Sequence, residues 1–338
     1  MTGRHTLEGL LIDPIDGARP GRLTIEDDVL AEVENDPSAA REPLVFPGFV
    51  DLQVYEPAGI VTTGVTAYLQ AAQEPVETAD PLCLGLHLEG PFLNPDAAGA
   101  IPVERLRTVD LGLLDEWLGR GDVRVVTVAP ELRGGLDAVR SVAGAGAVAA
   151  VGHTEANAAV TRAAIDAGAT LATHLWNAMT PVRARTTGPV PELLLDERVT
   201  LGLIADGRHL HPAIEELTVR LAGPQRIALT SDFVRTPVLA DNRLGGGDRT
   251  GCGLVARMAR FGLAEAATMA SLVPARLLGL TDRGRLAPGY RADLALLDER
   301  LNPLETYVAG NTLWAVRYPQ TQELDEIPPS TSAPGDGA

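Results

Sequence analysis

Three residues able to bind a metal ion stand at the ends of separate apolar segments. Glu89 ends the apolar part of GLHLEG, His153 ends AVGH, and His174 lies in ATHLWN. One carboxylate and two neutral imidazoles suit Zn²⁺ or a similar divalent ion and leave one position for water. Asp232, at the end of ALTSD, is the natural general base beside such a water. Each residue alone is more often structural, but their joint placement predicts a catalytic metal site.

His87 lies two residues before Glu89 in LHLEGPF, so the two side chains share a face if this segment is a strand. His87 lies deeper in the apolar run than Glu89 does. We therefore expect His87 to be a hydrogen-bonded core histidine and Glu89, at the strand end, to be the metal ligand.

Eight apolar, β-rich runs would have to position these residues. Several helical signals lie between them, such as TEANAAVTRAAIDAG, which has a Thr cap, an apolar period and a closing glycine. This alternation predicts a (β/α)8 TIM barrel over residues 46–284, with a doubly wound sheet as the main competitor. The runs are LVFPGFVDLQV, GVTAYLQA, PLCLGLHLEG, VRVVTVAPE, GAVAAVGH, TLATHLWN, TLGLIAD and RIALTSD.

Polar residues capable of chemistry follow nearly every run at its C-terminal end. In a parallel barrel these positions converge on one mouth, where such folds place their active sites. The residues are Gln53, Glu89, Glu131, His153, His174, Asp206 and Asp232.

The two chain ends carry a different pattern. Residues 1–45 and 285–320 read as short alternating strands with turns, which can pair into one small β domain made from both termini. Residues 321–338 are rich in Pro, Ser and Gly and predict a disordered tail.

Composition limits the partners and the chemistry. A formal net charge of −17 over 338 residues argues against nucleic acid and anionic membranes, although local arginines can still bind an anionic small molecule. All 28 basic residues are arginine, which excludes lysine-based catalysis and a carbamylated-lysine metal bridge. Cys83 and Cys252 do not have the spacing of a thiolate metal site. No secretion signal stands at Met1, so the cytoplasm is the expected location.

The motifs resemble those of the N-acetylglucosamine-6-phosphate deacetylases of the amidohydrolase superfamily. HLEGPFLNP, VGHTEAN, THLWNAMTP, LIADGRHLHP and LTSD occur in this order, followed by SLVPARLLGL and GRLAPGYRADLALLD. The resemblance covers residues 44–315. It implies a metal-dependent TIM barrel with a small β-sandwich built from both termini, usually as a homodimer, that acts on a small amino sugar phosphate.

The resemblance also implies roles for individual residues. The metal ligands would be Glu89, His153 and His174, and Asp232 would be the catalytic acid and base. The substrate contacts would be Asn177, Ala178, His209, Gln53 and an arginine from across the dimer interface, Arg185 or the nearby Arg183. Gln53 and Tyr55 replace the HxH pair that holds a second metal in many relatives, so we expect one divalent ion, Zn²⁺ first, with Fe²⁺, Mn²⁺ or Co²⁺ as alternatives.

One position departs from the family pattern. Ile101 stands in AAGAIP, where the family has a histidine that contacts the substrate carbonyl, and YLQAAQEP also lacks a histidine that some members carry. The leading hypothesis is removal of the N-acetyl group from N-acetylglucosamine 6-phosphate. The alternatives are hydrolysis of a different N-acyl or modified sugar, and a weakly active protein that binds a sugar phosphate. Residues 238–250 could form a lid over the site or a solvated connector.

Overall fold

The computed structural model describes residues 3–54, 62–68, 82–233 and 251–315, which form two β-sheets and the helices around them. Tyr55, the tail 321–338 and the proposed lid at 238–250 lie outside these residues. Among the described helices, none has both the length and the apolar character that crossing a bilayer requires.

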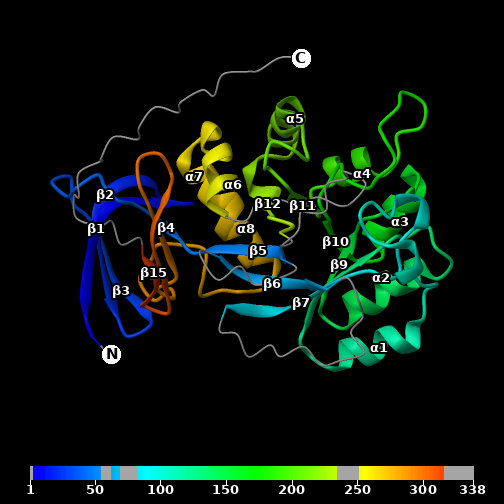
Figure 1. The fold of residues 1–338 in the computed structure, drawn as a ribbon, viewed down its shortest axis with the longest axis horizontal. Coiled ribbons are helices and arrows are strands. Elements are labelled where there is room, and N and C mark those ends of the chain that lie inside the picture. The colour runs from blue at the N-terminus through cyan, green and yellow to red at the C-terminus, as the bar shows by residue number, and fades with distance from the viewer. Residues whose placement is uncertain (1–2, 55–61, 69–81, 234–250, 316–338) are drawn as a thin grey trace, which may run out of the picture.

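Eight parallel strands form the larger sheet, and each strand pairs with the next one along the chain (Figure 1). An isolated parallel bridge from Val54 to Phe233 links the end of the first strand to the segment after the last. Together with the surrounding helices this is an α/β TIM-like fold. The strands are β5 (Phe49–Val54), β6 (Thr62–Tyr68), β7 (Cys83–Glu89), β8 (Val123–Val128), β9 (Val148–Val151), β10 (Ala169–Ala172), β11 (Thr200–Leu203) and β12 (Ile227–Leu229).

All eight predicted apolar runs contribute a strand to this sheet, with one correction at the first. The run LVFPGFVDLQV divides at Gly48, so that its second half forms β5 and its first half joins the other sheet. Gly48 packs closely on Asp293, and a Cβ there would lie 2.8 Å from the Asp293 Cβ. The chain therefore leaves one sheet and enters the next within a single residue.

Helices cover the outside of the parallel sheet (Figure 1). Apolar side chains of the strands and helices form one large buried cluster, as strands buried on both faces require. The α-helices are α1 (Leu111–Gly119), α2 (Gly135–Gly144), α3 (Ala158–Asp166), α4 (Val190–Leu195), α5 (Pro212–Ala222), α6 (Gly251–Met258), α7 (Leu263–Ala267) and α8 (Val273–Leu277). Short 3₁₀ turns η1 (Pro95–Ala97), η2 (Val103–Arg105), η3 (Pro224–Arg226) and η4 (Ala259–Phe261) and the π-helical turn η5 (Thr268–Leu272) complete the list.

The predicted Thr cap of α3 is wrong. The cap is Asn157, whose side chain accepts hydrogen bonds from the backbone N–H groups of Ala159 and Val160. Thr154 lies three residues earlier, and its hydroxyl donates to Glu131 instead. The closing glycine is present as Gly168, at a φ of +114°.

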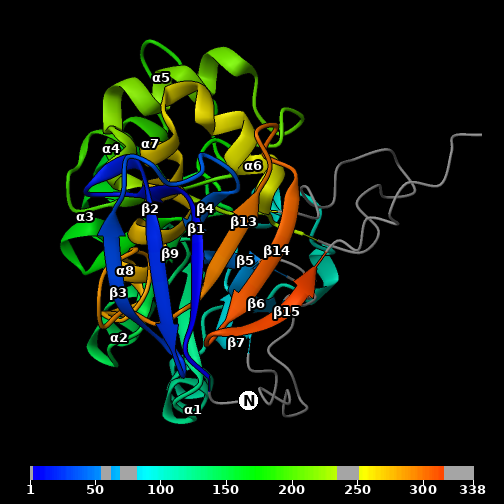
Figure 2. The same cartoon turned by 90° about the vertical axis from the view of Figure 1, so that its left-hand side faces the viewer.

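Strands from both chain ends form the second sheet, which faces the viewer in Figure 2. β4 is the joint, because it pairs in parallel with β1 and antiparallel with β13. The description of this unit as a β-sandwich and the exact domain boundaries stay predictions. The strand order is β15 (Asn311–Ala315), β14 (Pro303–Val308), β13 (Leu294–Leu297), β4 (Leu44–Pro47), β1 (His5–Asp13), β2 (Gly17–Glu26) and β3 (Val29–Asn35).

Successive side chains of β1 and β4 point to opposite faces of the terminal sheet, and both faces are packed. Leu11 and Val45 join a separate apolar cluster that belongs to the terminal sheet, whereas Ile12 and Leu44 join the large cluster of the barrel. Helix α7 also packs against β1 and β2. The terminal sheet is therefore continuous with the barrel core.

Asp13 connects the two chain ends by hydrogen bonds. Its buried carboxylate accepts from the backbone N–H of Leu286 (2.7 Å), from Arg285 Nη2 (3.0 Å) and from the N–H groups of Ile15 and Asp16 (2.9 Å each). Burial works to raise the pKa of Asp13, but the hydrogen bonds from Asp16, Arg285 and Leu286 outweigh it and lower that pKa below 3.8.

We expect Asp13→Asn to lower the free energy of unfolding by about 1.5–3 kcal/mol, because a hydrogen-bonded charge is lost and an NH₂ group faces donors. Since the folded-state pKa lies below the unfolded value of 3.8, this stabilisation is complete above that pH and is lost as pH falls through the folded-state pKa. Urea unfolding at several pH values measures both effects. Asp137→Asn is the control. Its side chain and that of its ion-pair partner Arg140 are each about 60% exposed, so the pair should contribute little to the free energy of unfolding. Equal losses in the two variants would contradict this role for Asp13.

Candidate active site

Glu89, His153 and His174 converge at the C-terminal ends of β7, β9 and β10. The Glu89 Oε1 atom lies 2.9 Å from His153 Nε2 and 2.8 Å from His174 Nε2, and the two Nε2 atoms are 3.1 Å apart. All three side chains are buried, and their ligand atoms lie within 4.8 Å of one another. The structure thus brings together the three residues that the sequence indicates as metal ligands.

The hydrogen bonds of this cluster fit a bound cation. His153 Nδ1 donates to the carbonyl of Ala97 (2.9 Å), so a neutral His153 carries its lone pair on Nε2, which faces the Glu89 carboxylate. Two groups that both offer lone pairs at this distance repel unless a positive charge lies between them. Glu89 Oε2 is one of the buried atoms of the described residues that lack a hydrogen-bond partner. A divalent ion held by this carboxylate and by the two Nε2 atoms would satisfy it.

The pKa values of the cluster also fit a bound cation. Burial works to raise the pKa of Glu89, but the nearby imidazoles of His153 and His174 outweigh it and hold that pKa at about 2. Burial works to lower the pKa of His153, but the Glu89 charge outweighs it and raises that pKa. The pocket therefore favours an ionised carboxylate together with positive charge.

Asp232 and Gln53 form a second part of the site, after β12 and near the end of β5. The Gln53 side chain donates from Nε2 to Asp232 Oδ1 at 2.6 Å. Burial, followed by the negative charges of Glu89 and Asp51, raises the pKa of Asp232 well above 3.8. A carboxyl group with a raised pKa can both accept and return a proton near neutral pH.

The backbone at the site is strained. Five of the eight non-glycine residues that the described chain holds at positive φ lie here, which are His153 (+47°), His174 (+28°), Trp176 (+83°), Ala178 (+50°) and Asp232 (+48°). Such conformations cost about 1–3 kcal/mol each and persist where the surrounding structure fixes them. Backbone hydrogen bonds supply part of that constraint, from Asn94 N to His153 O (3.1 Å) and from Thr154 N to Ala178 O (3.1 Å).

His87 lies one layer below the metal cluster. Its Nδ1 donates to the carbonyl of Leu52 (2.9 Å), and its Nε2 lies 2.7 Å from the Thr127 hydroxyl, which is 2.7 Å from that of Thr173. Burial lowers the pKa of His87 to about 4, so the ring is neutral at pH 7. The prediction of a hydrogen-bonded core histidine is confirmed.

Glu131, predicted to face the mouth, binds neighbouring loops. Its carboxylate accepts from Asn94 Nδ2 (2.8 Å), the Thr154 hydroxyl (2.5 Å) and the backbone N–H of Glu155 (2.7 Å). It thereby ties the loop after β7 to the residues that follow His153. Position at a strand end does not distinguish this role from catalysis.

Asp206 holds the loop that carries His209. Its carboxylate accepts from the backbone N–H groups of Arg208 and His209 and from His209 Nδ1, each at 2.9 Å. This leaves the Nε2 side of His209 for another partner. The motif DGRH provides this arrangement, since an aspartate that accepts from the N–H two residues on forms an Asx turn.

The other predicted substrate contacts, Asn177, Ala178 and Arg185, lie between β10 and α4. Asn177 and Ala178 lie three and four residues after His174 and are half-buried. A Cβ at Gly99 would lie 3.5 Å from that of Ala178 and 3.4 Å from His153 Cε1. Ile101 follows this glycine and is buried. Arg185 is exposed in a turn closed by the bridge between Arg183 and Thr186, in the segment that projects from the barrel between β10 and α4 (Figure 1).

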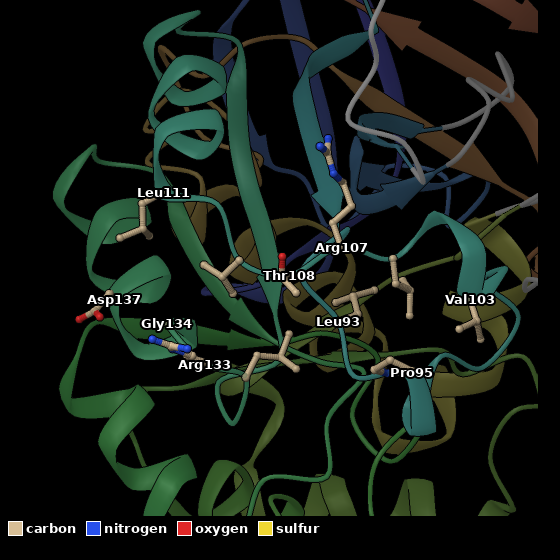
Figure 3. Close-up of a pocket in the computed structure, with 12 residues that line it drawn as sticks. Leu93, Pro95, Val103, Arg107, Thr108, Leu111, Arg133, Gly134 and Asp137 are labelled. Carbon is tan, nitrogen blue, oxygen red and sulfur yellow. The ribbon is translucent and has the colours of Figure 1, made fainter.

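A groove opens beside these loops, between residues 93–111 and 132–137 (Figure 3). Its lining is largely apolar, with Arg107, Arg133 and Asp137 among the polar members. Neither the Glu89 cluster nor Asp232 belongs to this lining, so the groove is separate from the candidate site.

Residues 56–313 match the amidohydrolase family. The N-acetylgalactosamine-6-phosphate deacetylase of Escherichia coli O157:H7 is 32% identical over 86% of this chain and 93% of its own length. The bovine (Bos taurus) N-acetylglucosamine-6-phosphate deacetylase is 30% identical over 88% of this chain and 89% of its own. A variant of the Mycobacterium smegmatis N-acetyl-D-glucosamine-6-phosphate deacetylase, solved in complex with N-acetyl-D-glucosamine-6-phosphate, superposes with a TM-score of 0.85 at 32% identity, over 92% of this chain and 99% of that one.

We expect zinc titration of metal-stripped protein to show one tight site per chain and a rise in Tm on binding, because a ligand that binds only the folded state stabilises it. Glu89→Gln and His174→Asn should each weaken binding by more than the roughly 10- to 100-fold that loss of a supporting group costs. His5→Asn, at an exposed histidine on β1, is the control and should bind as wild type does. Unchanged affinity in Glu89→Gln would show that the ion binds elsewhere.

Proposed function

We propose that this chain, which belongs to the N-acetylglucosamine-6-phosphate deacetylases of the amidohydrolase family, hydrolyses the N-acetyl group of an amino sugar phosphate. The substrate we propose first is N-acetylglucosamine 6-phosphate, giving glucosamine 6-phosphate and acetate. The observation that carries the proposal is the buried convergence of Glu89, His153 and His174 on one point.

Glu89, His153 and His174 would hold a single divalent ion, for which we propose Zn²⁺ before Fe²⁺, Mn²⁺ or Co²⁺. When bound, such an ion polarises a carbonyl group and lowers the pKa of water. The Ala97 carbonyl supports this role, because it keeps the His153 Nε2 lone pair directed at the site.

Asp232 would move the protons. In the first step its carboxylate takes a proton from the attacking water, and the oxygen of that water forms a bond to the amide carbon. In the second step Asp232 returns the proton to the amine nitrogen as the C–N bond breaks. Its raised pKa supports both directions of transfer, and Gln53 holds the carboxylate in place at 2.6 Å.

The sugar phosphate would be held by His209, Asn177, Ala178 and Gln53, together with Arg185 from a second subunit. Asp206 accepts from His209 Nδ1 and so fixes the ring, which leaves the Nε2 edge for the phosphate. The exposure of Arg185 on a projecting turn supports a homodimer in which this side chain, or Arg183, reaches the partner's site.

We place the barrel domain at residues 46–284, a small β-sandwich at 1–45 and 285–320, and the protein in the cytoplasm.

Ile101 supports a second candidate function, hydrolysis of a different N-acyl or modified sugar. Its side chain cannot donate a hydrogen bond to the substrate carbonyl, and loss of such a donor elsewhere costs about 100-fold or more in rate. The name of the Escherichia coli relative makes the 4-epimer, N-acetylgalactosamine 6-phosphate, the first alternative to test. Tight sugar phosphate binding without turnover would instead indicate a binding protein.

We expect metal-loaded protein to release acetate from N-acetylglucosamine 6-phosphate much faster than from N-acetylglucosamine. Asp232→Asn should reduce kcat by about 10²–10⁴-fold, the range for loss of a general acid and base, while metal content stays at one per chain. Asp137→Asn, on the exposed face of α2, is the control. Parallel assays with N-acetylgalactosamine 6-phosphate and longer N-acyl chains identify the substrate. Full turnover by Asp232→Asn would remove this residue from the mechanism.

His209→Gln and Arg185→Ala should raise KM for the phosphorylated sugar by about 10-fold or more, because each removes a charge-assisted hydrogen bond, which is worth roughly 1.5–3 kcal/mol. Neither change should alter kcat/KM for the unphosphorylated sugar. Arg140→Ala, an exposed arginine on α2, is the matched control. An equal effect on both substrates would mean that these residues do not bind the phosphate, and a loss confined to Arg183→Ala would assign the role to Arg183.

A further inference from the structure

Asp51 is a buried acid in the middle of β5 that the proposed chemistry does not use. It lies in FVDLQV, two residues before Gln53. Burial of a polar group in such a position costs free energy unless partners satisfy it, so the partners of Asp51 indicate its role.

Asp51 accepts hydrogen bonds from the two segments that hold Asp232, which are the residues after β12 and its own strand β5. From the segment after β12 it accepts from the Thr230 hydroxyl (3.0 Å) and from the backbone N–H of Ser231 (3.1 Å to Oδ2). From its own strand it accepts from the backbone N–H of Gln53 (3.0 Å). Asp51 thus joins the residue that precedes Asp232 to the residue whose side chain holds the Asp232 carboxylate.

The geometry of Asp232 explains why this link is needed. Asp232 is held at a φ of +48°, a conformation that L-residues rarely adopt without support. Strand β12 is only three residues long and ends at Leu229, so the barrel ladder itself stops before this point. Beyond it, β5 supplies the support, through Asp51, through a bond from Ser231 Oγ to the Gln53 carbonyl (3.5 Å), and through the bridge from Val54 to Phe233.

We infer that Asp51 is a positioning residue that acts through Asp232: it fixes the strained backbone of residues 230–232 and, through Gln53, the direction of the Asp232 carboxylate. This rests on the proposed role of Asp232 as the proton-transferring group. A displacement of about 1 Å in a catalytic group can cost about 100-fold in rate, so the link should be visible in kcat.

The test combines Asp51→Ala, Asp51→Asn and Thr230→Val with Asp232→Asn in double-mutant cycles on the metal-loaded protein. Asp51→Ala should lower kcat by about 100-fold with KM changed less than about twofold and with one metal still bound per chain. Asp51→Asn keeps an acceptor oxygen and should recover part of the loss. Thr230→Val removes one bond at nearly constant volume, so it should lower kcat less than Asp51→Ala does while folding normally. Thr268→Val is the matched control, because Thr268 is equally buried and donates only within its own helix.

If Asp51 acts through Asp232, the kcat losses from changes at the two residues should be strongly non-additive. In the Asp232→Asn background, Asp51→Ala and Thr230→Val should lower the residual rate no further. Equal fold-losses in both backgrounds, or a lower Tm with unchanged kcat, would overturn the inference and leave Asp51 as a purely structural residue.

Crystal structures separate this inference from the proposed function. In Thr230→Val and Asp51→Ala, the distance from Gln53 Nε2 to Asp232 Oδ1 should lengthen beyond 2.6 Å and Asp232 should leave its positive φ. If the wild-type protein releases no acetate, the proposed function fails, but a displaced Asp232 still supports the positioning role. An unmoved Asp232 in both variants would overturn that role regardless of activity.

Discussion

The ionised carboxylate of Glu89 is the constraint on which the rest of the site depends. A buried anion is stable only with compensating positive charge, which a cation bound between it and the two imidazole Nε2 atoms that lie within 2.9 Å would supply. Those imidazoles come from two other strands, so the charge requirement fixes the relative position of β7, β9 and β10. The same requirement makes the pocket selective for cations.

Two further sets of hydrogen-bonded residues hold the strained loops around the Glu89 carboxylate in place. Below it, Thr173, Thr127 and His87 form a chain of hydrogen bonds that ends on the Leu52 carbonyl. This chain links β5, β7, β8 and the residue after β10 through the barrel interior. Beside it, Glu131 and Asp206 each hold a loop by several hydrogen bonds. The polar residues at the mouth are thus of two kinds. Some point into the candidate active site, and others stabilise the backbone conformation of the loops around it.

Sequence reasoning predicted the strands and the Glu89 cluster, because apolar runs and the residues that end them follow directly from burial and chain direction. It placed Glu131 and Asp206 at the mouth without finding that they hold loops, because only the loop conformations decide which way these side chains turn. The Asn157 cap and the division of the first run at Gly48 were also missed. The Ala97 carbonyl, which orients His153, has no side-chain signature at all.

The position of β4 between β1 and β13 has a consequence for biosynthesis. Its outer edge pairs with residues 294–297, which leave the ribosome only after the whole barrel has been translated. Until then the N-terminal strands present an open apolar edge of the kind that promotes association between chains. Folding of this chain is therefore completed from its C-terminal end, and truncation before β13 would leave an otherwise intact barrel with one edge of β4 unpaired.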